Sequence, residues 1–199
     1  LSLLLQKNAK EKYYESIKSS IEFIFSLLLL IIAVPICILA CIAIYVELHV
    51  NPIYTQKRVG LNGRVFKIYK LRSMYIDAEK DGPKWASEND ERITKVGRII
   101  RKTRIDELPQ LVNILKRDMS FIGPRPERQE LIKYIPDFND RLLVKPGITG
   151  WAQVNGGYSL TPKEKLEFDK YYIQNRGFKL DLLILIKTIN VIFTRHGAR

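Results

Sequence analysis

The sequence predicts an α+β fold that is mainly α-helical, contains one small β-hairpin and is attached to a membrane helix. Three observations predict it: residues 23–46 carry no charge, aromatic and β-branched residues alternate around a turn at 60–63, and several later stretches have helical apolar spacing. The chain of 199 residues is 46% apolar, which is enough for one domain with a buried core. Its net charge of +12 indicates an anionic partner.

The apolar run at 23–46 predicts membrane insertion, because a membrane helix needs roughly 20 apolar residues. Pro35 lies near its middle and removes a backbone donor, so we expect the helix to kink or break there. A kinked span and a re-entrant hairpin are both open. Basic residues flank the run on both sides, and the positive-inside rule then favours a hairpin whose two ends stay in the cytoplasm. We divide the chain into a basic lead-in at 1–21, a re-entrant membrane helix at 22–48 and a soluble domain at 49–199.

Cysteine and histidine usage argues against two kinds of site. Cys37 and Cys41 lie inside the apolar run, where they are expected to act as small apolar residues. The only histidines, His49 and His196, are far apart and belong to no recognisable motif. We therefore expect neither a histidine zinc site nor a Ser-His-Asp triad.

The soluble domain opens with the hairpin, formed by the alternating stretches on either side of 60–63. A polar loop is expected at 81–91, a short helix at 94–102 and a longer helix at 162–175. Residues 118–126 and the glycine-rich stretch 144–158 are expected to be loops, the second anchored by Trp151 and Val154. The apolar tail from 180 predicts a helix that either completes the core or lies in the membrane interface.

Another helix is expected to start at the stretch "TRIDELPQL", with Asp106 as its N-cap and Pro109 in its first turn. Leu108, Leu111, Val112 and Leu115 have the spacing of one apolar stripe. Adjacent helical residues point in different directions, so Asp106 could act as a nucleophile while Glu107 holds a divalent cation. A solvated, charged helix start is the simpler alternative.

Fixed cations accompany the acid pair. Arg125 lies between two prolines in "GPRP", which suits bidentate phosphate binding, and Lys70 and Arg72 share one face of the expected hairpin. An exposed loop arginine and a solvated strand face are the alternatives. The glycine-rich stretch would let the backbone approach a ligand closely. Together with a nearby membrane, carboxylates and cations favour phosphoryl-group chemistry on a lipid.

The stretches "KIYKLRSM", "RIDELPQLVNILKRDMSFIGPRPE" and "VKPGITGWAQVNG" resemble the bacterial sugar transferase family. These are monotopic polyprenyl-phosphate phosphoglycosyl transferases that start the assembly of exopolysaccharide, capsule, O-antigen or other glycans. The resemblance implies a Mg²⁺-dependent ping-pong reaction in a compact catalytic domain surrounded by amphipathic interfacial helices. Asp106 would attack the β-phosphate of a UDP-sugar, UMP would leave, and undecaprenyl phosphate would take the phosphosugar. Glu107, together with Asp106, would hold the metal.

The resemblance also leads us to expect a set of substrate-binding residues. They are Arg58, Lys70, Arg72, Arg101, Arg125, Lys145, Gln153, Asn155 and Asp169. The chain departs from the family pattern at Val34, where a serine is common, at Glu22, where an aspartate is common, and at Gly157, where small members often carry an arginine. Lys145 or Arg128 is expected to replace that arginine.

The expected partners are a UDP-sugar, undecaprenyl phosphate and an anionic lipid bilayer, at the cytoplasmic face of the bacterial inner membrane. Galactose or glucose is favoured over an N-acetylated sugar as the transferred group. Nucleic acid is not expected, since the chain has no groove-reading motif, and a homodimer stays open. An inactive scaffold for glycan assembly and a membrane-anchored nucleic-acid-binding protein are the rival interpretations.

Overall fold

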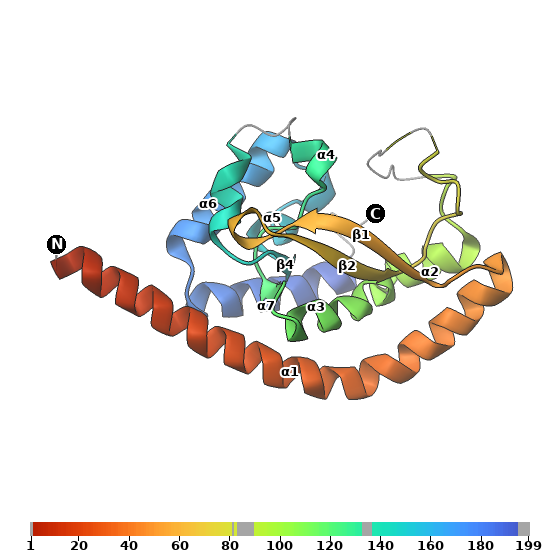
Figure 1. The fold of residues 1–199 in the computed structure, drawn as a ribbon, viewed down its shortest axis with the longest axis horizontal. Coiled ribbons are helices and arrows are strands. Elements are labelled where there is room, and N and C mark those ends of the chain that lie inside the picture. The colour runs from red at the N-terminus through yellow and green to blue at the C-terminus, as the bar shows by residue number, and fades with distance from the viewer. Residues whose placement is uncertain (1, 81, 83–89, 133–136, 195–199) are drawn as a thin grey trace.

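The computed structural model describes residues 2–80, 82, 90–132 and 137–194 (Figure 1). It is mainly helical with a small antiparallel hairpin, as predicted. The α-helices are α1 (Ser2–Leu48), α2 (Lys95–Lys102), α3 (Leu111–Leu115), α4 (Gln129–Ile132), α5 (Trp151–Val154), α6 (Pro162–Asn175) and α7 (Phe178–Thr194). The strands are β1 (Ile53–Val59), β2 (Val65–Leu71), β3 (Ser120–Ile122) and β4 (Gly147–Thr149). The loop expected at 81–91 lies largely outside the described residues.

Helix α1 runs along one side of the rest of the molecule as a curved rod whose convex side faces away (Figure 1). The predicted break at Pro35 is not confirmed, because the helix is continuous over Ser2–Leu48 and carries Pro35 inside it. Proline removes one backbone hydrogen bond, whereas ending and restarting a helix would leave several backbone groups without partners. In an apolar segment the second cost is larger, which favours a continuous, bent helix.

From Ile21 to Val46, the exposed surface of α1 is apolar. The stretch Lys10–Leu48 is long and apolar enough to cross a membrane. Ile31 is 72% exposed and Leu39 is 69% exposed, whereas the core helix of a water-soluble domain would bury such residues. Helix α7 adds a second exposed apolar face, with Leu182, Ile186 and Ile189. These surfaces indicate membrane association.

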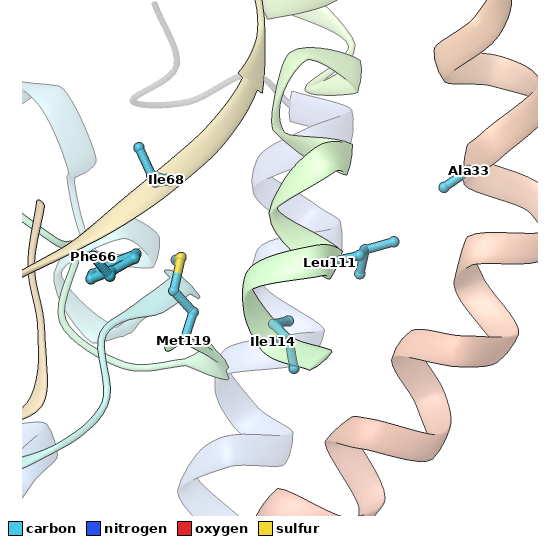
Figure 2. Close-up of a cluster of buried hydrophobic side chains, with 6 residues drawn as sticks. All are labelled: Ala33, Phe66, Ile68, Leu111, Ile114 and Met119. Carbon is cyan, nitrogen blue, oxygen red and sulfur yellow. The ribbon is translucent and has the colours of Figure 1, made fainter. Parts of the chain in front are cut away.

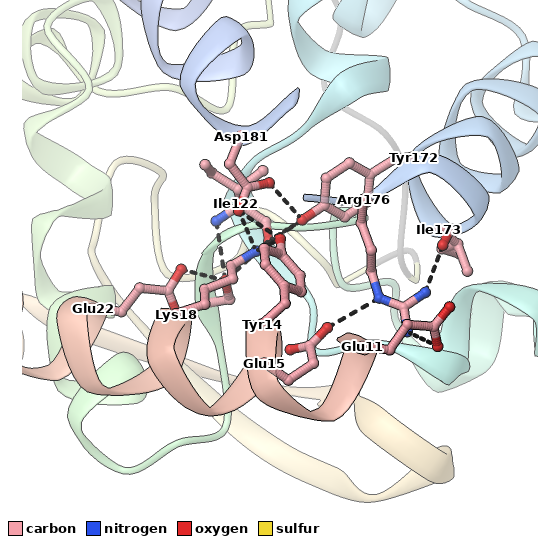
Figure 3. A network of polar contacts seen from close by, with 11 residues as sticks. Glu11, Tyr14, Glu15, Lys18, Glu22, Ile122, Tyr172, Ile173, Arg176 and Asp181 are labelled. Carbon is pink, nitrogen blue, oxygen red and sulfur yellow. Dashed lines mark hydrogen bonds and ion pairs between the residues drawn. The ribbon is translucent and has the colours of Figure 1, made fainter. Parts of the chain in front are cut away.

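A buried polar network ties the first half of α1 to the domain (Figure 3). Lys18 Nζ donates to Tyr172 Oη at 2.8 Å and to the Ile122 carbonyl at 3.0 Å, and it lies 3.1 Å from Asp181 Oδ2. Tyr14 Oη also donates to Asp181 Oδ2, at 2.6 Å. The network joins α1, β3, α6 and α7 around one buried ion pair, Lys18–Asp181.

We expect Lys18→Ala to lower the free energy of unfolding by about 3–5 kcal/mol, because it leaves the buried Asp181 carboxylate without its cation. Lys12→Ala is the matched control, since it removes the same charge from an exposed position on the same helix. The measurement is chemical or thermal unfolding of the detergent-solubilised protein. Equal stability of the two variants would show that the ion pair does not fasten α1.

The hairpin is confirmed, with β1 and β2 antiparallel in the register Ile53↔Leu71 to Val59↔Val65. Its turn is made possible by Asn62 and Gly63, which adopt positive φ angles of 54° and 77°. The inner face of the hairpin packs on α3, and α1 covers the other side of α3 (Figure 2). The buried residues of this core are Ala33, Phe66, Ile68, Leu111, Ile114 and Met119.

The predicted helix at 94–102 is confirmed as α2, and Thr94 caps it by accepting a hydrogen bond from the Gly97 amide. A second cap comes from α1. The carboxylate of Glu47 accepts from the Lys95 amide at 2.8 Å and from the Val96 amide at 3.0 Å. Glu47 therefore satisfies two free N–H groups of α2 and fixes the end of α1 against it.

The segment of the acid pair differs from the prediction. A 3₁₀ helix spans Ile105–Gln110, and its N-cap is Arg104 in a left-handed conformation (φ 59°), so Asp106 is not an N-cap. The tight turn at Arg104 directs both acids inward, where Asp106 is 7% and Glu107 is 8% exposed. The apolar stripe is partly correct, because Leu111 is buried but Val112 and Leu115 are only half-buried.

The stretches expected to be loops contain a parallel pairing of β3 with β4. A Cβ added at Gly147 would lie 2.1 Å from the Gly123 amide nitrogen, so this pairing requires glycine. The glycine-rich stretch thus approaches another backbone segment closely, rather than only a ligand. Trp151 and Val154 are confirmed as anchors, since they pack against the core of the C-terminal half.

The predicted helix at 162–175 is confirmed as α6, which starts with a capping box between Thr161 and Glu164. For the apolar tail, the expected helix is confirmed as α7, and one of its faces completes the core. Ile184 is fully buried in the core, whereas Leu182 and Ile186 are exposed.

Candidate active site

The two acids meet cations from two different parts of the chain. Glu107 Oε1 accepts a hydrogen bond from Lys70 Nζ at 2.9 Å and another from Arg125 Nη2 at 2.7 Å. Lys70 comes from β2 of the hairpin, and Arg125 from the "GPRP" segment after β3. The geometry depends on packing of the hairpin, the 3₁₀ helix and the β3–β4 pair against one another.

The surroundings push the pKa values of the two carboxyl groups apart. Burial, and then the negative charge of Glu107, raise the pKa of Asp106 from 3.8 to about 6. Burial alone would also raise the pKa of Glu107, but the positive charges of Arg125, Lys70 and Arg104 outweigh it and hold that pKa well below its usual range. Two adjacent acids with separated pKa values are typical of catalytic pairs with different roles.

Asp106 is the less satisfied member of the pair. Its Oδ1 atom is buried and has no hydrogen-bond partner among the described residues. Lys70, Arg101 and Arg104 lower its pKa through their charges but do not offset the effect of burial. A buried carboxylate oxygen without a partner costs free energy, and it is poised to accept a cation or to attack an electrophile.

Two pockets of different character lie on Arg125, the arginine that contacts Glu107. The larger has a volume of about 310 Å³ and apolar walls, with Glu107 among its lining residues. The smaller has a volume of about 60 Å³ and is lined mainly by charged side chains, among them Glu127, Arg141 and Lys165. Arg104, Arg125 and Gln153 line both. Two ligands of different polarity could therefore reach the same cations.

Comparison with known proteins places this site in a family. The family model described as "Bacterial sugar transferase" matches residues 13–195. The chain belongs to the bacterial sugar transferase family. Lys70, the acid pair and Arg125 all lie within the matched range.

Curated relatives of this sugar transferase include three undecaprenyl-phosphate enzymes. It is 42% identical over 193 residues to the UDP-N-acetylgalactosamine-undecaprenyl-phosphate N-acetylgalactosaminephosphotransferase of Aeromonas hydrophila, covering 94% of this chain and 46% of the relative. It is 38% identical to the undecaprenyl-phosphate galactose phosphotransferase of Salmonella typhimurium, covering 98% and 44%. A putative undecaprenyl-phosphate N-acetylgalactosaminyl 1-phosphate transferase of Bacillus subtilis is 50% identical, with 70% and 78% covered. The chain thus spans about half the length of the first two.

The structure brings together four of the nine expected substrate-binding residues. Lys70 and Arg125 contact Glu107, the charge of Arg101 acts on Asp106, and Gln153 lines both pockets beside Arg125. The Nε2 and Oε1 atoms of Gln153 are buried and unpartnered among the described residues, so this amide can still bind a ligand.

Arg58 and Asp169 do not contact the acid pair but support the segment that carries Arg125. Asp169 Oδ2 is 2.8 Å from Arg141 Nε, and Arg141 Nη2 donates to the Arg125 carbonyl at 3.0 Å. Arg58 Nη1 donates to the Pro126 carbonyl at 2.9 Å. Arg58 therefore holds the backbone of the "GPRP" segment directly, and Asp169 holds it through Arg141.

Three expected substrate-binding residues have partners away from the acid pair. Arg72 follows the end of β2 and donates from Nε to the Asn51 carbonyl at 2.9 Å. Lys145 Nζ is 3.4 Å from Ser19 Oγ of α1, and Asn155 Oδ1 accepts from Lys187 Nζ of α7 at 2.7 Å. These placements depend on the twist of β2 and on the docking of α1 and α7. Local sequence shows neither the twist nor the docking.

Sequence analysis missed Arg104, Glu127 and Arg141 as site residues. Arg104 has a local signal, because it directly precedes the acid pair and both pockets use it. Arg141 and Glu127 have none, since they meet only in the folded chain, at 3.7 Å.

Proposed function

We propose that this sugar transferase moves a sugar 1-phosphate from a UDP-sugar to undecaprenyl phosphate, as the first membrane step of glycan assembly. The observation that carries the proposal is the buried acid pair, in which Lys70 and Arg125 hold Glu107, next to an apolar and a charged pocket that share Arg125. The names of the relatives from Aeromonas hydrophila and Salmonella typhimurium, which include undecaprenyl phosphate and a sugar, support it. The transferred sugar is a hexose, N-acetylated or not.

In the first half-reaction, the Asp106 carboxylate attacks the β-phosphorus of the donor. An Asp106 oxygen–phosphorus bond forms, the bond from that phosphorus to the bridging oxygen breaks, and UMP leaves with the bridging oxygen. In the second, a phosphate oxygen of undecaprenyl phosphate attacks the same phosphorus and the Asp106 carboxylate is released. A covalent intermediate divides one difficult transfer into two displacements.

The shared arginines support this sequence of steps. Arg104 and Arg125 line both pockets, so the donor's diphosphate and the acceptor's phosphate compete for the same cations. Competition for the same cations favours substrates that bind in turn, with the phosphosugar kept on the protein in between. Guanidinium groups stabilise the negative charge that develops on the transferred phosphoryl group.

Mg²⁺ is proposed as the cofactor, held by Asp106 and Glu107. The structure describes no group of three or more metal-binding side chains. Two carboxylates nevertheless suit Mg²⁺, which commonly uses one or two of them together with substrate phosphates. The unpartnered Oδ1 of Asp106 fits this role, and the side-chain bonds that Glu107 accepts both end on Oε1. Mg²⁺ would supply charge screening and polarisation of the donor's phosphates.

The proposed location is the cytoplasmic face of the bacterial inner membrane, with α1 as a re-entrant helix. The bend of α1, its exposed apolar surface and basic residues on both flanks support this topology (Figure 1). A homodimer remains a proposal.

The test of the proposed function uses the full chain in detergent with Mg²⁺, undecaprenyl phosphate and a panel of UDP-sugars. We expect UMP and a lipid-linked diphosphate sugar to form in equal amounts with at least one donor. A folded preparation that yields neither with any donor would favour the inactive scaffold.

The donor half-reaction should depend on pH through Asp106, which attacks only when ionised. Because its pKa is raised to about 6, UMP release in a single turnover should rise from about pH 5 and level off above about pH 7. Removing a positive charge that lowers this pKa, as in Arg101→Gln, should move the midpoint to higher pH. A flat profile in the wild type would contradict Asp106 as the ionising nucleophile.

A further inference from the structure

The apolar pocket beside Glu107 is a large cavity with no ligand assigned to it so far. It has a volume of about 310 Å³, in the range of cavities that hold small ligands. Helix α1 supplies one part of its wall and α7 another. The apolar residues that line it are Leu29, Ile32, Ala33, Ile36, Leu108, Leu111, Phe121, Ile148, Val154, Val191 and Ile192.

Charge is confined to one part of this cavity. Arg104, Glu107 and Arg125 line it, and every other lining side chain is apolar or uncharged. This distribution fits an amphiphile with a phosphate head and a hydrocarbon tail. A nucleotide-sugar fits poorly, because its hydroxyl groups would lose water against walls that offer few hydrogen bonds.

The cavity is also continuous with the surface that indicates membrane association. Ile32 is 64% exposed and Ile192 is 45% exposed, so both helices carry apolar side chains from the cavity wall out to the molecular surface. A lipid could therefore enter from the bilayer without its chain crossing water.

We propose that this cavity binds the phosphate-proximal isoprene units of the polyprenyl acceptor, with the acceptor's phosphate at Arg104 and Arg125. The inference rests on the proposed function and adds the position of the acceptor. The smaller, charged pocket that shares these arginines then serves the nucleotide donor. Helix α1 is part of the acceptor site as well as a membrane anchor.

The test narrows the cavity from each wall separately. Leu29→Trp fills it from α1 and Val191→Trp fills it from α7. Leu28→Trp and Ile189→Trp are matched controls on the same helices, because these residues are exposed and do not line the cavity. Each variant is assayed for UMP release without lipid and for discharge of the phosphosugar adduct by undecaprenyl phosphate.

We expect the two wall variants to slow discharge about tenfold or more, because the indole ring would occupy space that the hydrocarbon chain of the acceptor needs. Their UMP release should stay within about twofold of the wild type, and the controls should be unchanged in both steps within the same margin. Using two walls keeps the test valid if one variant does not fold.

Discharge that is as fast in the wall variants as in the controls would overturn the proposal. So would an equal loss of both half-reactions in folded variants, because the cavity would then serve the donor or the site as a whole. Absence of both UMP and lipid-linked product from the wild type, with undecaprenyl phosphate present, would instead overturn the proposed function, and the acceptor site with it.

Discussion

Asp106→Asn should abolish formation of the phosphosugar adduct and slow UMP release by about 10⁴-fold or more, as expected when a covalent nucleophile is removed. The amide has nearly the same shape but no nucleophilic oxygen. Because Asp106 is buried beside Glu107 and forms no cap, the substitution should leave the fold intact. The readouts are UMP release and the intact mass of the protein after exposure to donor. An adduct of normal yield in this variant would place the nucleophile elsewhere.

The same substitution should make the protein more stable at neutral pH. The folded-state pKa of Asp106 is raised from 3.8 to about 6, so its favourable contribution to stability is present below about pH 4 and lost as the pH rises through about 6. Ionised Asp106 thus destabilises the fold at pH 7, by about 1–3 kcal/mol, and asparagine removes that cost.

The measurement is the melting temperature at about pH 7.5 and about pH 4.5. The gain from Asp106→Asn should be clear at the higher pH and shrink at the lower. Asp77→Asn, at an exposed position, is the control for removal of one negative charge. A lower melting temperature at neutral pH would show that the Asp106 carboxylate stabilises the fold.

Arg125→Ala should slow both half-reactions by about 10²–10³-fold, the usual effect of removing one charged donor that stabilises a transition state. Arg125 contacts Glu107 and lines both pockets, so the donor and acceptor steps should be affected alike. Arg125→Lys should recover only part of the rate, because lysine keeps the charge but loses the planar pair of donors.

The control for this prediction is Arg128→Ala, in the same segment of chain. Arg128 pairs with Glu79 and lines neither pocket. Its loss should change either rate by no more than about twofold. Equal losses in the Arg125 and Arg128 variants would mean that Arg125 acts through the conformation of the segment and not on the phosphates.

The elements that the sequence predicted well are those with local causes. The hairpin depends on an Asn-Gly turn and alternating side chains, α2 on the Thr94 cap, and α6 on a capping box. The acid pair was found because Asp106 and Glu107 are adjacent in a basic region. Lys70 and Arg125 were found as fixed cations, and their contact with Glu107 required the structure.

The features that escaped prediction depend on tertiary packing. β3 and β4 have three residues each, too few to show a period, and they pair only because Gly123 and Gly147 allow close approach. Asp169 was expected at the substrate, but it lies behind Arg141, a residue with no local signal. At Pro35 the local preference for a break was outweighed by the cost of freeing backbone groups in an apolar helix.

The most direct test of the central claim is the intact mass of the wild-type chain after incubation with Mg²⁺ and UDP-sugars in the absence of lipid. The proposed mechanism requires a mass gain of one phosphosugar with release of UMP. Peptide mapping should place the adduct on Asp106, and undecaprenyl phosphate should discharge it. Lipid-linked product that forms without any adduct, under conditions that trap acyl phosphates, would contradict the covalent mechanism and indicate direct transfer between the two substrates.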